Sequence, residues 1–167
     1  MSKQSQHNDL HAFMQTNPEG TLEQIAQQYQ ATMTEVIAAI PDAIITDGSQ
    51  FDTVWQEVAG WGEITFLVHT ADIIAEFSGE LPEGKHGAGY FNLHHKQGFG
   101  GHIRAENCQH IAFVERNFMR MATASILFLN HHGEAMFKIF VGRDQQRQLK
   151  ADQLEKFRNL AQRFKSA

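Results

Sequence analysis

The chain has 167 residues, of which 42% are hydrophobic, so it is long enough to form one domain with its own core. A single cysteine, Cys108, excludes an intramolecular disulfide and favours a reducing compartment. The first ten residues are polar, and no apolar run approaches the roughly 20 residues needed to cross a bilayer. We therefore predict a cytoplasmic protein without a membrane partner.

The net charge of −5 conceals an uneven distribution of charge along the chain. Residues 1–84 contain one basic residue, Lys3, against thirteen acidic ones, whereas residues 85–167 contain thirteen basic residues against six acidic ones. The two halves therefore carry net charges of −12 and +7. This asymmetry favours a basic site in the second half or association with the opposite half of a second copy, besides the alternative of an ordinary solvated acidic surface.

Helical spacing of apolar residues dominates the first third of the chain, after a polar tail. One helix is predicted to begin at Thr21, which is a good N-cap residue. A second helix is predicted over residues 32–40, where it stops before Pro41, and a third over residues 51–59. Residues 41–49 are predicted to join this helical segment to the rest of the chain.

From residue 63 onward, β-rich runs separated by turn residues replace the helical pattern. Strands are predicted at residues 64–68, 72–77, 90–93, 101–103, 110–114, 124–129 and 135–141. Residues 130–133 form a hairpin loop between the last two strands, and residues 148–164 an amphipathic helix. Because the connections are too short for crossover helices, an antiparallel meander is favoured.

The predicted class is therefore α+β, with N-terminal helices, a central antiparallel meander sheet and a C-terminal amphipathic helix. Residues 1–45 form a small N-terminal helical subdomain, and residues 46–167 form the antiparallel-sheet domain that contains the binding site. We expect the two to form one structural unit.

Histidine is unusually frequent, with ten residues in the chain. The pairs His94-His95 and His131-His132 are poor metal sites, because adjacent residues on a strand point to opposite faces. His69 instead closes an apolar strand, and His102 follows two glycines that would let a flat ligand approach the backbone. These two histidines are candidates to line a pocket in the sheet.

Several other site classes are disfavoured by their missing motifs. The chain has no Cys pair and no His-Glu-x-x-His for zinc, and neither a phosphate-binding glycine loop nor a serine elbow. Residues 21–37 have the look of a helix-turn-helix, but the second helix contains Glu35 and no basic residue. Because phosphate contacts supply most non-specific DNA affinity, we predict no nucleic-acid partner.

Cationic and aromatic side chains accompany the predicted strands of the second half. Arginine or lysine at a pocket rim would pair with carboxylates of a ligand. The candidates are Arg104, Arg116, Arg120, Lys138 and Arg143. Thirteen phenylalanines, Phe77 and Phe91 among them, are available for the core or for the face of a flat ligand.

Seven short strings occur in order along the chain. They are FDTVW from Phe51, WG from Trp61, LVHTAD from Leu67, EFSG from Glu76, GYFNL from Gly89, GHIRAEN from Gly101 and KIFVGRD from Lys138. Together they resemble the HutX/ChuX family of intracellular haem-utilisation carrier proteins. The resemblance extends from about Leu10 to Lys165.

The resemblance implies a split-barrel-like fold and a homodimer whose paired sheets look like one monomer of the larger HemS/ChuS haem-handling proteins. It implies haem as the bound group, held in a cleft of the sheet and delivered to a downstream haem-degrading enzyme. His69 and His102 match the histidines proposed to contact the haem iron in this family, and Tyr90 is the alternative iron ligand.

With haem as the expected ligand, the cationic and aromatic candidates named above take specific roles. Arg104, Lys138 and Arg143 would pair with the haem propionates, and Phe77 and Phe91 would pack on the porphyrin. A haem-degrading enzyme that uses an external electron donor is the main alternative function, and a helix-turn-helix regulator is a weaker one.

Overall fold

A computed structural model describes residues 2–165. The helices are α1 (Lys3–Gln15), α2 (Leu22–Tyr29), α3 (Met33–Ala38), α4 (Phe51–Ala59) and α5 (Ala151–Arg163), with 3-10 turns η1 (Gly48–Gln50) and η2 (Ala105–Asn107). The strands are β1 (Ile44–Asp47), β2 (Glu63–His69), β3 (Ile74–Glu80), β4 (Gly84–Gly87), β5 (Tyr90–Lys96), β6 (Phe99–Ile103), β7 (Cys108–Phe118), β8 (Met121–Asn130) and β9 (Ala135–Phe140).

The strands form two antiparallel sheets, which confirms the predicted α+β class. The large sheet has the order β1-β7-β8-β9-β2-β3, so the β2–β3 hairpin lies beside β9. Within this large sheet, only β7, β8 and β9 form a meander. The small sheet, β4-β5-β6, is separate. The split occurs after β3, where Pro82 cannot donate a backbone hydrogen bond and its carbonyl accepts one from the indole of Trp55, at 2.7 Å.

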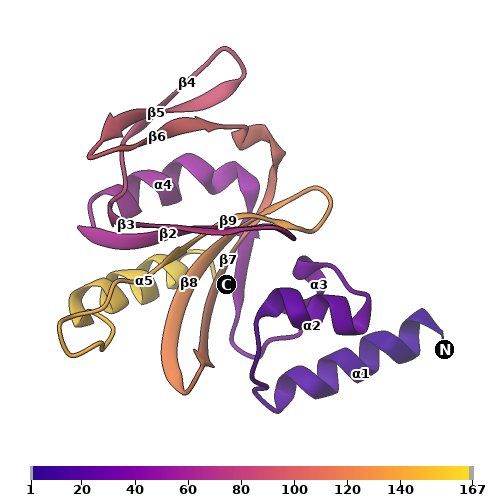
Figure 1. The fold of residues 1–167 in the computed structure, drawn as a ribbon. Coiled ribbons are helices and arrows are strands. Elements are labelled where there is room, and N and C mark those ends of the chain that lie inside the picture. The colour runs from indigo at the N-terminus through magenta and orange to yellow at the C-terminus, as the bar shows by residue number, and fades with distance from the viewer. Residues whose placement is uncertain (1, 166–167) are drawn as a thin grey trace.

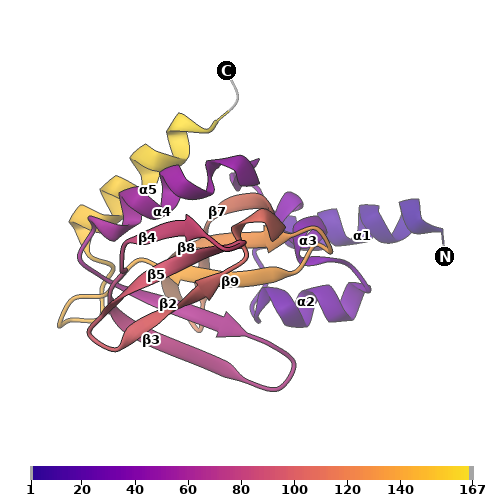
Figure 2. The ribbon, with the colours of Figure 1, turned by 90° about the horizontal axis from the view of Figure 1, so that it is seen from above.

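The elements stack in layers (Figures 1 and 2). Helices α4 and α5 cover one face of the large sheet, helices α1 to α3 cover part of the other face, and the small sheet lies beyond α4. Strand β8 contributes side chains to both faces of the large sheet. Ile126 and Phe128 pack with α4 and α5, while Leu127 and Leu129 pack with the N-terminal helices.

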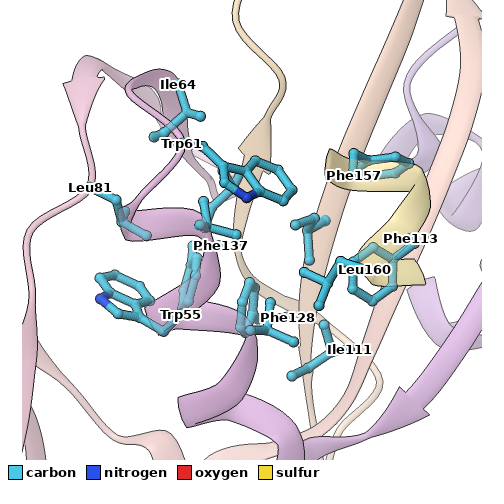
Figure 3. Packing of buried hydrophobic residues seen from close by; sticks show 14 of the residues in the cluster. Trp55, Trp61, Ile64, Leu81, Ile111, Phe113, Phe128, Phe137, Phe157 and Leu160 are labelled. Carbon is cyan, nitrogen blue, oxygen red and sulfur yellow. The ribbon is translucent and has the colours of Figure 1, made fainter. Parts of the chain in front are cut away.

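The larger core is rich in aromatic rings (Figure 3). Phe128 and Phe137 stack with ring centroids 4.4 Å apart, and Phe51 packs edge-on against both. Burial of such rings contributes most of the hydrophobic stabilisation in a core of this kind. The core fixes the strands that carry the candidate site.

Most predicted elements are confirmed. Helix α2 begins after Thr21, which forms a capping box with Gln24, and the loop after Asn130 is a hairpin turn. Three segments differ from prediction. Residues 84–87 form strand β4, which was not predicted. Residues 3–15 form helix α1 instead of a polar tail, and residues 44–47 within the predicted joint form β1, which pairs with β7.

The N-terminal helices are attached to the large sheet by a half-buried arginine as well as by apolar packing. Arg116 of β7 donates hydrogen bonds to the carbonyl oxygens of Pro18 and Gly20, at 2.7 and 2.8 Å. Burial lowers the pKa of Arg116 from its ordinary value, and nearby Glu19 and Glu23 oppose this effect. Arg116, one of the predicted rim cations, therefore anchors the segment before α2. None of the helices in residues 2–165 combines the length and apolar character needed to cross a membrane.

Candidate functional site

Three of the predicted ligand-binding residues gather on one face of the small sheet. Tyr90 lies on β5, His102 on β6, and Arg104 directly after β6. Asn92 pairs with His102 across the two strands, so the side chains of Tyr90, Asn92 and His102 share the face that points away from α4. The guanidinium of Arg104 donates a hydrogen bond to the Tyr90 hydroxyl at 2.8 Å, and its central carbon lies 4.5 Å from the ring centroid.

Asn92 determines how the imidazole of His102 is presented. The Asn92 amide nitrogen donates to the carbonyl oxygens of Lys85 and Gly87, so its oxygen faces His102, with Oδ1 2.7 Å from Nδ1. An amide oxygen only accepts hydrogen bonds, so Nδ1 of His102 is the donor. The Nε2 lone pair of the neutral ring is then free for a metal. Asn92 was not among the residues predicted from the sequence, although strand alternation places it on the same face as Tyr90.

An apolar cleft of about 450 Å³ lies beside this face, between β6 and the large sheet. Both His102 and Arg104 line it. Its other lining residues are Phe66, Val68, Leu93, Phe99, Gly100, Gly101, Ile103, Asn107, Met136 and Phe137. Gly101 has a φ of +142°, which favours glycine, and open space where a Cβ would lie. The cleft therefore offers an apolar surface with a polar, ligand-bearing rim.

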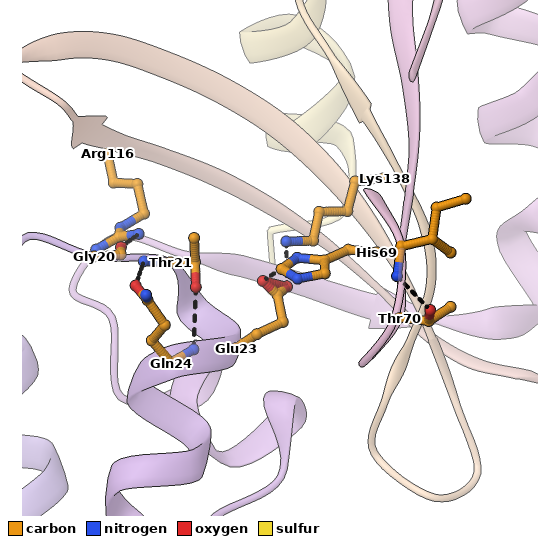
Figure 4. Close-up of polar contacts among 9 residues, drawn as sticks. Gly20, Thr21, Glu23, Gln24, His69, Thr70, Arg116 and Lys138 are labelled. Atoms are coloured by element: carbon orange, nitrogen blue, oxygen red, sulfur yellow. Dashed lines mark hydrogen bonds and ion pairs between the residues drawn. The ribbon is translucent and has the colours of Figure 1, made fainter. Parts of the chain in front are cut away.

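A second cluster of predicted residues forms where α2 meets the large sheet (Figure 4). Nδ1 of His69, at the end of β2, lies 3.0 Å from a carboxylate oxygen of Glu23. The other carboxylate oxygen of Glu23 forms an ion pair with the ammonium of Lys138 on β9. Lys138 is buried, and the side chains of His69 and Glu23 are about one-fifth exposed, at 19% and 23%.

The two clusters lie on opposite sides of strand β2. Val68 lines the apolar cleft, and the next residue, His69, points the other way and contacts α2. The structure therefore brings Tyr90, His102 and Arg104 together and brings His69 and Lys138 together. Within one chain, the side chains of His69 and His102 do not face a common ligand position.

The remaining predicted residues support these clusters from further away. Phe77 stacks on the cleft residue Phe99, with ring centroids 4.6 Å apart. Phe91 is buried against Phe51, with centroids 5.2 Å apart, and so belongs to the core beneath the small sheet. Arg143 donates to the carbonyl oxygens of Ala122 and Arg147 and thereby orders the loop after β9.

The described part of the chain offers no alternative metal centre. In residues 2–165, no group of three histidine, cysteine or acidic side chains is placed to hold a metal ion. Burial raises the pKa of Cys108 to about 12, so this buried residue is a neutral thiol. The ligand chemistry therefore concentrates in the two clusters around the cleft and at α2.

The layered α+β fold defines the class of architecture, and comparison with known proteins shows the family. The sequence model of the family "Haem utilisation ChuX/HutX" matches residues 44–160, which is more than half of the chain. The chain therefore belongs to the ChuX/HutX family. Helices α1 to α3 precede the matched range.

Individual relatives agree with this assignment. The chain is 33% identical over 144 residues to the intracellular heme transport protein HutX of Vibrio cholerae, covering 84% of this chain and 75% of HutX. A solved structure of the heme-binding protein ChuX is 55% identical, with a TM-score of 0.88 over 92% of this chain and 97% of ChuX.

A more distant fold neighbour is about twice as long. The heme-binding protein PhuS from Pseudomonas aeruginosa is 18% identical, with a TM-score of 0.74. The alignment covers 96% of this chain and 46% of PhuS, so a PhuS chain has room for two units of this size. The likeness is one of fold.

Proposed function

We propose that this protein is a cytoplasmic haem-binding carrier, which receives haem after uptake, holds it and transfers it to a haem-degrading enzyme. Its family relatives support the proposal, since HutX is named an intracellular heme transport protein and ChuX a heme-binding protein. The observation that carries it is the clustering of two iron-ligand types, Tyr90 and His102, with Arg104 on the small sheet. His102 and Arg104 also line the apolar cleft.

This arrangement matches the chemistry of haem. A neutral imidazole or a phenolate can serve as the axial ligand of the iron, and a porphyrin packs on apolar and aromatic side chains. Arg104 can pair with a propionate or balance the charge of an iron-bound Tyr90 oxygen. Phe99, supported by Phe77, supplies an aromatic surface in the cleft.

His69 and Lys138 constitute a second proposed contact region on the other side of β2. Lys138 is paired with Glu23, and Arg143 with backbone carbonyls, so either residue would have to exchange partners to bind a propionate. Because one chain holds His69 and His102 apart, both could contact one haem only if they came from different chains. We propose a homodimer, which the charge asymmetry and the double length of PhuS also favour. A monomeric mass in light scattering at micromolar concentration and physiological salt would contradict the dimer.

A titration of the purified protein with ferric haem tests the binding proposal. We expect a saturable complex, with weaker binding or an altered ligand field in His69→Ala, His102→Ala and Tyr90→Phe. His132→Ala, in the exposed β8–β9 loop, is the matched control. Wild-type spectra and affinity in all three variants and in the double histidine variant would contradict the site, and absence of saturable binding would contradict the function.

Haem degradation with an external electron donor is the alternative function, and one experiment separates it from transport. Reductant and oxygen are added to the haem complex while its absorbance is followed. A carrier retains the haem spectrum, whereas an enzyme converts it to that of a bile-pigment-like product. The names of the relatives HutX and ChuX favour the carrier.

A further inference from the structure

Glu23 makes a charged contact to His69, one of the two candidate ligand histidines. Its carboxylate lies 3.0 Å from Nδ1 of His69 and also binds the buried ammonium of Lys138. The contact is an ion pair by distance and not an aligned hydrogen bond, because within the described part of the chain neither carboxylate oxygen of Glu23 has a hydrogen-bond partner. The negative charge next to Nδ1 favours the proton on that nitrogen. In residues 2–165, Nε2 has no hydrogen-bond partner, so its lone pair is free in the neutral ring.

The contact is held rigidly from both sides. On the helix side, the capping box of Thr21 and Gln24 fixes the start of α2, and Arg116 binds the carbonyl oxygens just before it (Figure 4). On the strand side, the Thr70 hydroxyl accepts hydrogen bonds from the backbone N–H groups of Asp72 and Ile73, at 3.2 Å each. These bonds fix the turn after His69. The imidazole and the carboxylate are therefore preorganised.

The surface next to His69 is apolar. Ile74 pairs with His69 across β2 and β3, so the two side chains share one face of the sheet. Ile74 and its neighbour Ile73 are 56% and 57% exposed, and they are two of the three large exposed hydrophobic side chains in residues 2–165. A free imidazole nitrogen beside exposed isoleucines suits an apolar ligand that carries a metal.

We propose that Glu23 is a positioning residue for haem ligation by His69. Its charge next to Nδ1 favours the tautomer that leaves Nε2 for the iron, orients the ring, and strengthens Nε2 as a donor. Carboxylate–histidine–metal arrangements have this effect in other metal sites, where loss of the outer partner weakens metal binding about 10- to 100-fold. Lys138 limits the negative charge that Glu23 brings to the site. The inference rests on the proposed function, because it requires His69 to bind the iron.

The test compares Glu23→Gln, His69→Ala and Lys138→Met in the full-length haem complex. Glu23→Gln keeps the shape and an acceptor oxygen but removes the charge. We measure the rate of haem loss to apomyoglobin and the iron–histidine stretching frequency of the ferrous complex by resonance Raman spectroscopy. We expect Glu23→Gln to lose haem about 10- to 100-fold faster and to lower the stretching frequency. His69→Ala is expected to abolish the mode.

The Lys138→Met variant distinguishes a positioning role of Glu23 from a purely structural role, in which Glu23 only holds α2 against the sheet. It breaks the ion pair between α2 and the sheet but leaves the carboxylate on His69, so we expect the stretching frequency to stay at the wild-type value or to rise. Equal effects of Glu23→Gln and Lys138→Met on every readout would mean that Glu23 only holds α2, and would overturn the inference. Glu155→Gln, an exposed charge on α5, is the control for net charge. Glu23→Asp keeps the charge with a shorter reach and should give intermediate values.

Failure of the inference can be distinguished from failure of the function. If the wild-type protein does not bind haem, the proposed function is wrong and the inference falls with it. If it binds haem and His69→Ala behaves like the wild type, or if His69→Ala is impaired while Glu23→Gln is not, the carrier function stands and the role of Glu23 is overturned.

Discussion

Gln153 on α5 offers a sharp test of how the large sheet is held in place. Its side chain is 1% exposed and forms three hydrogen bonds. Its amide nitrogen donates to the carbonyl oxygens of Trp61 and Glu63, at 3.0 and 2.7 Å, and its oxygen accepts from the N–H of Gly142, at 2.8 Å. One side chain thus joins the start of β2, which carries His69 at its other end, to the chain beyond β9.

The substitution Gln153→Ala removes all three bonds. Trp61 and Gly142 are buried, so their backbone groups lose a partner that water cannot readily replace. With about 1 to 2 kcal/mol for each buried group left unpaired, the free energy of unfolding should fall by about 3 kcal/mol. For a chain of this size, this corresponds to a melting temperature lower by roughly 6–12 °C.

Thermal and urea unfolding followed by circular dichroism would measure the change. Gln162→Ala is the matched control, because Gln162 lies on the same helix with an exposed side chain. We expect the control to stay within about 0.5 kcal/mol of the wild type. A loss below about 1 kcal/mol in Gln153→Ala would refute the reasoning that these bonds fix the strand ends.

Three further predictions follow from single contacts. Since the pKa of Cys108 is raised from 9.0 to about 12, the protein should lose stability as the pH rises between these values. The native thiol should also react slowly with a disulfide reagent at pH ~8, and fast labelling of the native protein would contradict this. A Cβ on Gly48 would lie 1.9 Å from the carbonyl oxygen of Cys108, so Gly48→Ala should lower the free energy of unfolding in urea by about 2 kcal/mol or more. Gly60→Ala, where the nearest atom would lie 3.5 Å from the new Cβ, should not lower it in this way. Asn92→Ala frees the ring of His102 and should weaken haem binding about 10- to 100-fold in a titration; unchanged affinity would exclude an orienting role.

Local sequence patterns predicted the elements whose signals are themselves local. Thr21 and Gln24 are three residues apart and form their capping box within one helical turn, and the turn after Asn130 joins neighbouring strands. Helix α1 escaped prediction because only Leu10 and Met14 on it are buried, which leaves a weak apolar stripe. Strand β1 has four residues, and its pairing with β7 depends on a partner that is distant in the sequence.

The candidate site was predicted residue by residue, but its grouping was not. The family resemblance selected His69, His102 and Tyr90, and the structure shows which of them are neighbours. The grouping of Tyr90 with His102 depends on the register of β5 against β6. The contact between Glu23 and His69 depends on how α2 packs on the large sheet. Neither the register nor the packing leaves a periodic signal in the sequence.

The two candidate histidines are held in the same way by different acceptors, and this difference predicts unequal roles. Both present Nδ1 to an acceptor, which is the neutral amide of Asn92 for His102 and the carboxylate of Glu23 for His69. A carboxylate next to Nδ1 stabilises positive charge on the ring more than a neutral amide does, and so makes the opposite ring nitrogen the better donor. If both histidines bind iron, His69 should be the stronger ligand, and loss of haem to apomyoglobin should be faster from His69→Ala than from His102→Ala. Equal rates, or the reverse order, would mean that the acceptors do not set the donor strength, and that access to the cleft governs release instead.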